Sequence, residues 1–341
     1  MRHQHSYISG TKLFQIIVLS LLSILIIDFL LSLFMKRMFD DSNTEVRNVL
    51  NKTNANLIIL GSSTVSRGIN PEIIDRNLNT KSYSFASDGT GIFYALGILR
   101  QVPLDSNLEY VIFGIDPQSF VTGYKSSNFK QIERLLPYAI SDKIVMDFIS
   151  HEKDWLSVKM ISRSYPYVAN FKEIIKNILR NKILNNEYYD EYNFRPLNGT
   201  IINKNDYQKI GDNKIEESGV LNISDEGVYL LDLLSKELID RDLKLIITTL
   251  PVYNTKLRSN QQKYSEVMNV IKNKLQKVNL CDLSQLEDVN ILNITDEVSN
   301  FYDGPHLNSV GAKSFSKYLF CKPKSAVIRK ITLKISLGRE E

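Results

Sequence analysis

The sequence predicts an α/β fold with a parallel sheet and a largely helical insertion, preceded by one transmembrane helix. Three observations support this prediction. Residues 13–34 are almost entirely apolar. Over the rest of the chain, short apolar runs that suit buried strands alternate with segments of helical periodicity. The alternation breaks between about residues 120 and 226, where aromatic and Asn-rich stretches predict helices and loops inserted over the strand ends.

The composition argues against some classes of function. The chain has 341 residues, of which 43% are hydrophobic, enough for a full core. Its net charge of +4 is small and its charges of both signs are mixed, which does not favour nucleic acid as a partner. No Cys/His cluster has metal-ligand spacing, so we expect neither a metal nor another cofactor. A disulfide between Cys281 and Cys321 stays open, because two cysteines suit either redox compartment.

The apolar segment at residues 13–34 reads LFQIIVLSLLSILIIDFLLSLF. About 20 apolar residues are enough to cross a bilayer. The segment is long for a signal peptide and lacks a small-residue cleavage site, which indicates an uncleaved signal-anchor. The flanking basic residues are nearly balanced, and Asp40 and Asp41 follow closely. We predict a single-pass protein of the cell membrane, with residues 1–12 cytoplasmic and the large domain extracytoplasmic.

Asp28 is the one charge within the predicted span. A carboxylate in lipid is costly, so Asp28 either faces the helix of a partner membrane protein, or snorkels toward the membrane surface or lies in a locally hydrated site. The polar residues 35–55 after the span are predicted to form a juxtamembrane linker or helix.

The predicted α/β domain covers residues 56–321, including the insertion at about 120–226, and a basic tail follows at residues 322–341. Alternating strands and helices imply right-handed crossovers and a parallel sheet. Pro71, after Asn70 as a cap, predicts the start of a helix. The expected strands are residues 57–61, 82–86, 110–115, 244–250 and 278–283, and further helices are expected at 90–101, 261–277 and 309–320.

A serine motif follows the first strand. Gly61-Ser62-Ser63 comes directly after the apolar run 57–60, at the carboxyl end of a strand, where open parallel sheets place their sites. A serine hydroxyl becomes a good nucleophile only beside a base. The alternative is that Gly-Ser-Ser is only a turn, because serine-rich turns are common.

His306 is the candidate base. The only other histidine beyond the apolar segment is His151, which is predicted to be a surface residue. His306 follows Gly304-Pro305, which predicts a turn, and Asp303 lies three residues before it. A carboxylate at this spacing can fix the imidazole tautomer and leave the other ring nitrogen free as a base.

Together, the motif after the first strand and the Asp-x-x-His before the last helix resemble the SGNH, or GDSL-like, hydrolase family. The resemblance implies a three-layer, flavodoxin-like domain and points to Ser63 rather than Ser62 as the nucleophile. It also implies that Gly89, in the segment Ser87–Gly91, offers its backbone N–H to the oxyanion. The family's third block, Gly-x-Asn-Asp, is replaced here by Gly114–Pro117, so the asparagine donor is missing.

Asp116 stands in the neighbourhood of the missing asparagine. A carboxylate cannot donate a hydrogen bond to an oxyanion. Asp116 therefore has another role, or the donor is lost or supplied elsewhere, for instance by Gln118. The stretches 116–120 and 250–254 resemble those of membrane-anchored members of the family that serve the D-alanylation of teichoic acids. The resemblance covers about residues 55–125 and 240–320.

The resemblance implies a membrane-anchored serine esterase or O-acyltransferase that acts on cell-envelope glycans. Ser63 would take an acyl group from a carrier or donor and pass it to a glycan hydroxyl or to water. A multi-span membrane acyltransferase is the partner that such an anchored enzyme implies. The alternative function is a non-catalytic scaffold that binds an acyl donor or such an acyltransferase, since fold alone predicts function weakly.

Two residue groups have a second interpretation. Gly89-Thr90-Gly91 after a strand is part of a dinucleotide-binding fingerprint, but Tyr94 stands where the third glycine belongs. Arg67 is either an anchor for a substrate carboxylate or phosphate beside Ser63, or a structural member of an ion pair.

Overall fold

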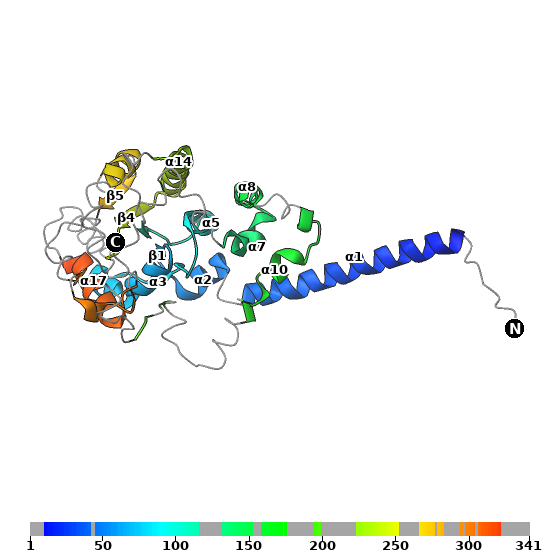
Figure 1. Cartoon of the computed structure of the whole chain (residues 1–341), viewed down its shortest axis with the longest axis horizontal. Coiled ribbons are helices and arrows are strands. Elements are labelled where there is room, and N and C mark those ends of the chain that lie inside the picture. Colours follow the sequence, from blue (N-terminus) through cyan, green and yellow to red (C-terminus); the bar gives the residue numbers. More distant parts are fainter. Residues whose placement is uncertain are drawn as a thin grey trace, which may run out of the picture. The chain divides into compact units, whose positions relative to one another are not determined.

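The computed structural model describes residues 10–41, 45–115, 120, 131–152, 158–172, 174–175, 192, 194, 196–198, 223–251, 266–276, 278–282, 294–295, 297–303 and 306–321. The chain divides into two compact units, and each unit is described by itself. The first unit comprises Met1–Glu45 and Leu136–Leu184, and the second comprises Val46–Leu135 and Asn185–Glu341. Figure 1 shows the elements of both.

The second unit contains a parallel sheet of five strands in the order β2-β1-β3-β4-β5. The prediction of an α/β fold with a parallel sheet is therefore confirmed, and each predicted strand is present with slightly shorter ends. Ile58 in β1 pairs with Tyr83 in β2 and with Val111 in β3, so β1 is an inner strand. The strands are β1 (Leu57–Leu60), β2 (Ser82–Ser84), β3 (Tyr110–Gly114), β4 (Lys244–Thr248) and β5 (Asn279–Asp282).

Helices cover the apolar strands on both faces. All four residues of β1 are buried, as expected of a parallel strand between two helix layers. Side chains that alternate along the strands, such as Leu57 and Ile59, join a core that includes residues from the helices α3, α4 and α17. Figure 1 shows α5 and α14 on the other side of the strands. The bounds are α3 Ser63–Gly68, α4 Pro71–Leu78, α5 Ile92–Arg100, α14 Asp225–Asp240 and α17 Ser309–Cys321.

Two helix caps follow from local sequence. Asn70 Oδ1 accepts a hydrogen bond from Ile73 N at 3.3 Å, and Pro71 begins α4, as predicted. Asn308 Oδ1 accepts from the backbone N of Val310 and of Gly311, both at 3.0 Å, at the start of α17. Because α17 packs against α3 and α4, the cap brings the chain just before α17 close to the end of β1.

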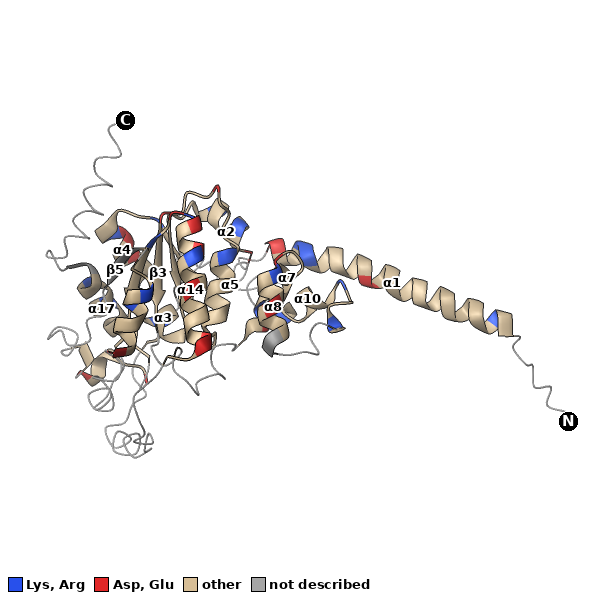
Figure 2. Ribbon diagram, turned by 90° about the horizontal axis from the view of Figure 1, so that it is seen from above, with Lys and Arg blue, Asp and Glu red and all other residues tan. Residues whose placement is uncertain are grey.

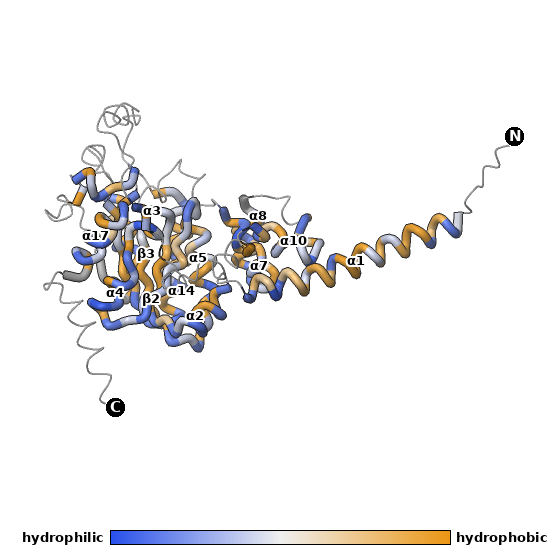
Figure 3. Tube along the Cα trace, turned by 90° about the horizontal axis from the view of Figure 1, so that it is seen from below, coloured by the Kyte–Doolittle hydropathy of each residue, from blue (hydrophilic) through white to orange (hydrophobic). Residues whose placement is uncertain are grey.

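The first unit is built around α1 (Gly10–Asp41), which extends past both ends of the predicted span 13–34. α1 is long and apolar enough to cross a membrane; Figure 3 shows its nearly continuous hydrophobic colour and Figure 2 its few charges. Among the described residues of this unit, three short helices accompany it, and all three lie within the predicted insertion. They are α7 (Leu136–Ala139), α8 (Lys143–Glu152) and α10 (Tyr165–Val168).

Residues 35–41 belong to α1, and Val46–Thr53 forms a separate helix, α2, in the second unit, so the region predicted as linker or helix is mainly helical. Several predictions lie outside the described residues and side chains. They concern Asp116, Gln118, His151, the pair Cys281 and Cys321, and the tail 322–341.

Candidate active site

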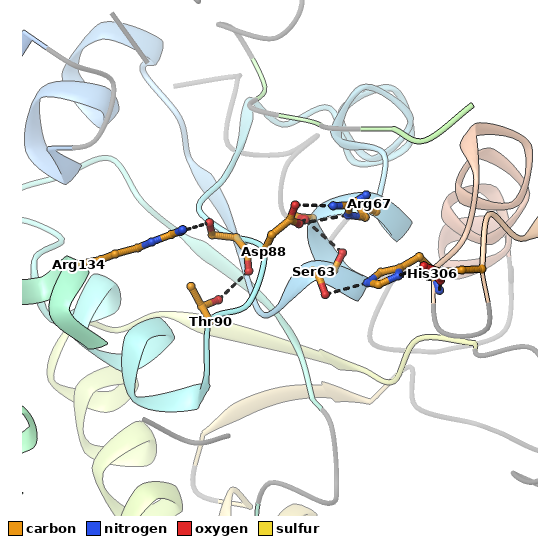
Figure 4. A network of polar contacts seen from close by, with 9 residues as sticks. Ser63, Arg67, Asp88, Thr90, Arg134 and His306 are labelled. Carbon is orange, nitrogen blue, oxygen red and sulfur yellow. Dashed lines mark hydrogen bonds and ion pairs between the residues drawn. The ribbon is translucent and has the colours of Figure 1, made fainter. Parts of the chain in front are cut away.

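Ser63, His306 and Asp303 lie in hydrogen-bond contact (Figure 4). His306 Nε2 is 2.9 Å from Ser63 Oγ. His306 Nδ1 is 2.7 Å from Asp303 Oδ1 and 2.9 Å from Oδ2. The side chains of His306 and Asp303 are 19% and 34% exposed, so the pair is partly shielded from water but reachable. The structure thus brings together the three residues that the sequence singled out as nucleophile, base and orienting acid.

The turn between β1 and α3 positions Ser63. Gly61 has a φ of 148°, in the region that favours glycine. A Cβ atom at Gly61 would lie 2.3 Å from Val65 Cγ2, and one at Gly114, at the end of β3, would lie 2.1 Å from the same methyl group. The two glycines therefore let Val65 pack tightly at the strand ends, and α3 begins at Ser63, three residues after β1 ends.

Ser62 has a different partner from Ser63. The Ser62 hydroxyl and the Thr64 hydroxyl share a hydrogen bond of 3.1 Å, whereas the Ser63 hydroxyl contacts His306. Ser62 precedes α3 as its cap residue, and Ser63 is the first helical residue. Of the two serines, Ser63 is therefore the one whose hydroxyl contacts His306.

A closed turn holds the imidazole of His306. His306 N donates to Asp303 Oδ1 at 2.9 Å, and Tyr302 N donates to His306 O at 2.9 Å. Phe301 and Leu307, on either side of this turn, form a β-bridge and are almost fully buried. With Asp303 accepting the Nδ1–H, the Nε2 lone pair faces the Ser63 hydroxyl, the tautomer that a general base requires.

The loop after β2 lies beside the turn between β1 and α3. Ser87 N donates to Gly61 O at 3.2 Å, and Thr90 Oγ1 donates to Ser87 O at 2.8 Å. Gly89 has a φ of 72°, a left-handed conformation that a residue with a side chain rarely adopts. Within the described residues, neither the Ser63 N–H nor the Gly89 N–H has a hydrogen-bond acceptor. As far as the described residues go, both groups are available as donors, as an oxyanion site needs.

Sequence reasoning assigned no role to Asp88. Its carboxylate accepts from Arg67 Nη2 at 2.5 Å, from Arg67 Nε at 3.2 Å and from Ser66 Oγ at 3.0 Å (Figure 4). Arg67 is thus the member of an ion pair that ties the Gly89 loop to α3. The sequence could have indicated that Ser66 and Arg67 lie near Ser63. They follow it by three and four residues, a spacing that places side chains on one face of a helix.

Arg134 approaches the same loop from the side away from Ser63, as Figure 4 shows. Arg134 Nη1 donates to Ser87 Oγ at 2.5 Å. Arg134 belongs to the 3₁₀ helix η2 (Ile132–Leu135), within the predicted insertion. The loop that carries Gly89 is therefore held from two sides, by Arg67 and by Arg134.

β3 ends at Gly114, the first residue of the third block, and residues 116–119 lie outside the described part of the chain. No protein-family model matches the chain, and no curated protein is significantly similar to it in sequence.

Proposed function

We propose that this protein is a membrane-anchored serine esterase or O-acyltransferase of the SGNH type that acts on cell-envelope glycans. The observation that carries the proposal is the continuous contact from Asp303 through His306 to Ser63. The strand order 2-1-3-4-5, which is that of flavodoxin-like sheets, supports the fold family. The position of Ser63 after the inner strand β1 supports its role as nucleophile.

In the first half-reaction, Ser63 Oγ attacks the carbonyl carbon of an acyl ester. His306 Nε2 accepts the hydroxyl proton as the new carbon–oxygen bond forms. The Asp303 carboxylate keeps the Nδ1 proton in place and stabilises the imidazolium that results. His306 then gives the proton to the leaving alkoxide, which departs as an alcohol and leaves the acyl group on Ser63.

In the second half-reaction, a hydroxyl group attacks the acyl-enzyme. His306 Nε2 takes the proton of the incoming hydroxyl and returns it to Ser63 Oγ when the acyl–serine bond breaks. A glycan hydroxyl as acceptor gives acyl transfer, and water gives hydrolysis. The two outcomes use the same residues and differ in the second nucleophile.

The tetrahedral intermediate carries a negative oxygen in both half-reactions. We propose that the N–H groups of Ser63 and Gly89 donate to this oxygen, since both lack other acceptors among the described residues. The contacts of Asp88 with Arg67 and Ser66 would then fix the separation between the two donors. The apolar helix α1 supports the membrane anchor and hence a substrate at the cell envelope.

A serine-reactive fluorophosphonate tests the proposal on the full chain in detergent. We expect Ser63→Ala to abolish labelling. Ser62→Ala is the matched control, because the Ser62 hydroxyl contacts Thr64 rather than His306, and it should keep near-full labelling. Persistent labelling of folded Ser63→Ala would disprove the choice of nucleophile. A folded wild-type chain that never reacts would favour the scaffold function instead.

A further inference from the structure

The one charge in the apolar stretch of α1 is bound by its own unit. Asp28 Oδ1 accepts from Ser162 Oγ at 2.7 Å, from Ser164 Oγ at 2.6 Å and from Ser164 N at 3.2 Å, and Oδ2 accepts from Arg163 N at 2.8 Å. A carboxylate has about four acceptor positions, so these donors satisfy Asp28 almost completely. Within the structure, Asp28 therefore binds a turn of the insertion, residues 162–164.

The depth of this contact along α1 is informative. Asp28 precedes Phe34, the end of the predicted span, by six residues, which is about 9 Å at the helical rise. Beyond Asp28, apolar side chains of α1 such as Leu30, Leu33 and Phe34 are still exposed. If α1 is in lipid as far as Phe34, the turn that binds Asp28 lies below the surface of the hydrocarbon.

We call residues 158–172 the interfacial segment. Their side chains suit a position at the boundary between lipid and water. Val158 and Ile161 are 66% and 82% exposed, and Val168 and Phe171 are also exposed. The segment contains three basic residues and no acidic one. Exposed apolar side chains interleaved with Lys and Arg are typical of segments that lie in the bilayer interface.

Further contacts fix the interfacial segment to α1. The Arg163 guanidinium lies 5.6 Å from the ring centroid of Phe29, and Tyr167 packs against Phe39 with ring centroids 5.9 Å apart. The irregular backbone at residues 162–164 bonds with Asp28, which matters because backbone N–H groups near hydrocarbon need partners within the protein.

We propose that the interfacial segment is a second membrane contact of this chain, seated on the bilayer beside α1. Val158, Ile161 and Phe171 lie among the acyl chains, and Lys159, Arg163 and Lys172 reach the lipid phosphates. The proposed occupant of this surface is the lipid bilayer itself, because α1, whose apolar side chains are exposed, packs against α10 of this segment and is itself proposed to lie in lipid. This inference depends on the proposed anchoring by α1 and is independent of the chemistry at Ser63.

Tryptophan quenching by brominated lipid tests the inference on the full chain. The chain has one native tryptophan, so Trp155→Phe gives a silent background. Into it we place Ile161→Trp in the interfacial segment, Leu22→Trp in α1 as the lipid control, and Leu104→Trp in the second unit, where Leu104 is 78% exposed, as the water control. Each variant is reconstituted alone in vesicles of phosphatidylcholine and phosphatidylglycerol whose acyl chains carry bromine at shallow and at deep positions.

We expect strong quenching at position 22, at least half as much at position 161, and almost none at position 104. Suppose that position 22 is quenched but position 161 is quenched no more than position 104. This result would overturn the proposed membrane contact of the interfacial segment and leave the anchoring by α1 intact. Low quenching at position 161 is also the result expected if the segment binds a partner protein instead of lipid. The vesicles contain no partner, so the segment would then stay in water. Absence of quenching at position 22 would overturn both anchor and contact.

Tryptophan itself prefers the membrane interface, so Ile161→Trp could bring the segment to the lipid by itself. A variant in which two basic residues become acidic controls for this effect. Lys159→Glu with Lys172→Glu, added to Ile161→Trp, should reduce quenching at position 161 at least two-fold in these anionic vesicles. Unchanged quenching would overturn the phosphate contacts. Fluorophosphonate labelling of Ser63 in the same vesicles should be unaffected by all of these variants, so a failure of the proposed chemistry would be seen separately.

Discussion

Two carboxylates, one in each unit, accept several hydrogen bonds but serve different purposes. Asp303 accepts from the backbone and ring of His306, whose other nitrogen contacts Ser63. Asp28 accepts from two hydroxyls and two backbone N–H groups of residues 162–164. None of the donors to Asp28 changes charge near neutral pH, whereas an imidazole does. The ability of the partner to gain a proton therefore distinguishes a candidate catalytic acid from a structural one.

Asp88 shares features with both the candidate catalytic Asp303 and the structural Asp28. Two of its donors are the permanently charged Arg67 and the hydroxyl of Ser66, and neither exchanges protons in the neutral range. It lies, however, directly before Gly89, whose N–H is a proposed oxyanion donor. Asp88 is therefore expected to affect the reaction through position, not through proton transfer.

The largest effect is expected for Asp303→Asn. Asn keeps an oxygen that can accept from His306 N, so the turn should stay folded. Its amide NH₂, placed against the ring, would favour the tautomer with the proton on Nε2, which cannot accept a proton from Ser63. By analogy with measured triads, hydrolysis of a small aryl ester should fall by about 10⁴, or ~5 kcal/mol of barrier. The measurement is the steady-state rate of the full chain in detergent, with a thermal melt as control. Near-full activity would show that Asp303 does not orient the base.

Asp88→Asn should have a smaller effect on the same reaction. The change weakens the ion pair with Arg67 and loosens the loop before Gly89, and small displacements of catalytic groups lower rates by up to about 10²-fold. We expect a loss in kcat of about 30-fold with little change in KM for the aryl ester. Arg76→Gln is the control, since Arg76 is 73% exposed and pairs with Glu72 within α4. A change confined to KM would contradict a role in placing the oxyanion donor.

Asp28→Leu should weaken the first unit and leave the chemistry unchanged. It removes the acceptor for four donors and frees the turn at residues 162–164. A loss of about 1–2 kcal/mol in local opening free energy corresponds to roughly ten-fold faster trypsin cleavage after Lys159 or Arg163 in detergent. Ser23→Leu is the matched control, because the Ser23 hydroxyl donates to Leu19 O within α1. Equal cleavage of both variants would show that Asp28 does not hold the turn.

The smallest effect is expected for Ser62→Ala. The hydroxyl of Ser62 shares a hydrogen bond with Thr64 and caps no backbone N–H of α3. Loss of one such partly exposed bond costs about 1 kcal/mol of stability, and the aryl-ester rate should change less than about three-fold. A much larger loss of rate would mean that Ser62, rather than Ser63, carries part of the chemistry.

Much of the fold and of the candidate site could be predicted because its signals are local. An unbroken apolar run such as 57–60 is enough to predict a strand buried on both faces. Asp303 and His306 are three residues apart, so one turn decides whether they meet. Asn70 and Asn308 cap the helices directly after them. In each case, the interacting groups are neighbours in the chain, and few backbone conformations are open to them.

The sequence by itself therefore determined the strands, the apolar helix and the His306–Asp303 pair. Only the tertiary structure decided which side chains, distant in sequence, bond to which carboxylate. Arg67 lies 21 residues from Asp88, and Ser162 lies 134 residues from Asp28. Such pairs form only when packing of the elements brings both groups into one place, and any other Asp or Arg has the same intrinsic chemistry. Residue type and spacing set what a group can bond to, and the packed elements set which of those bonds forms.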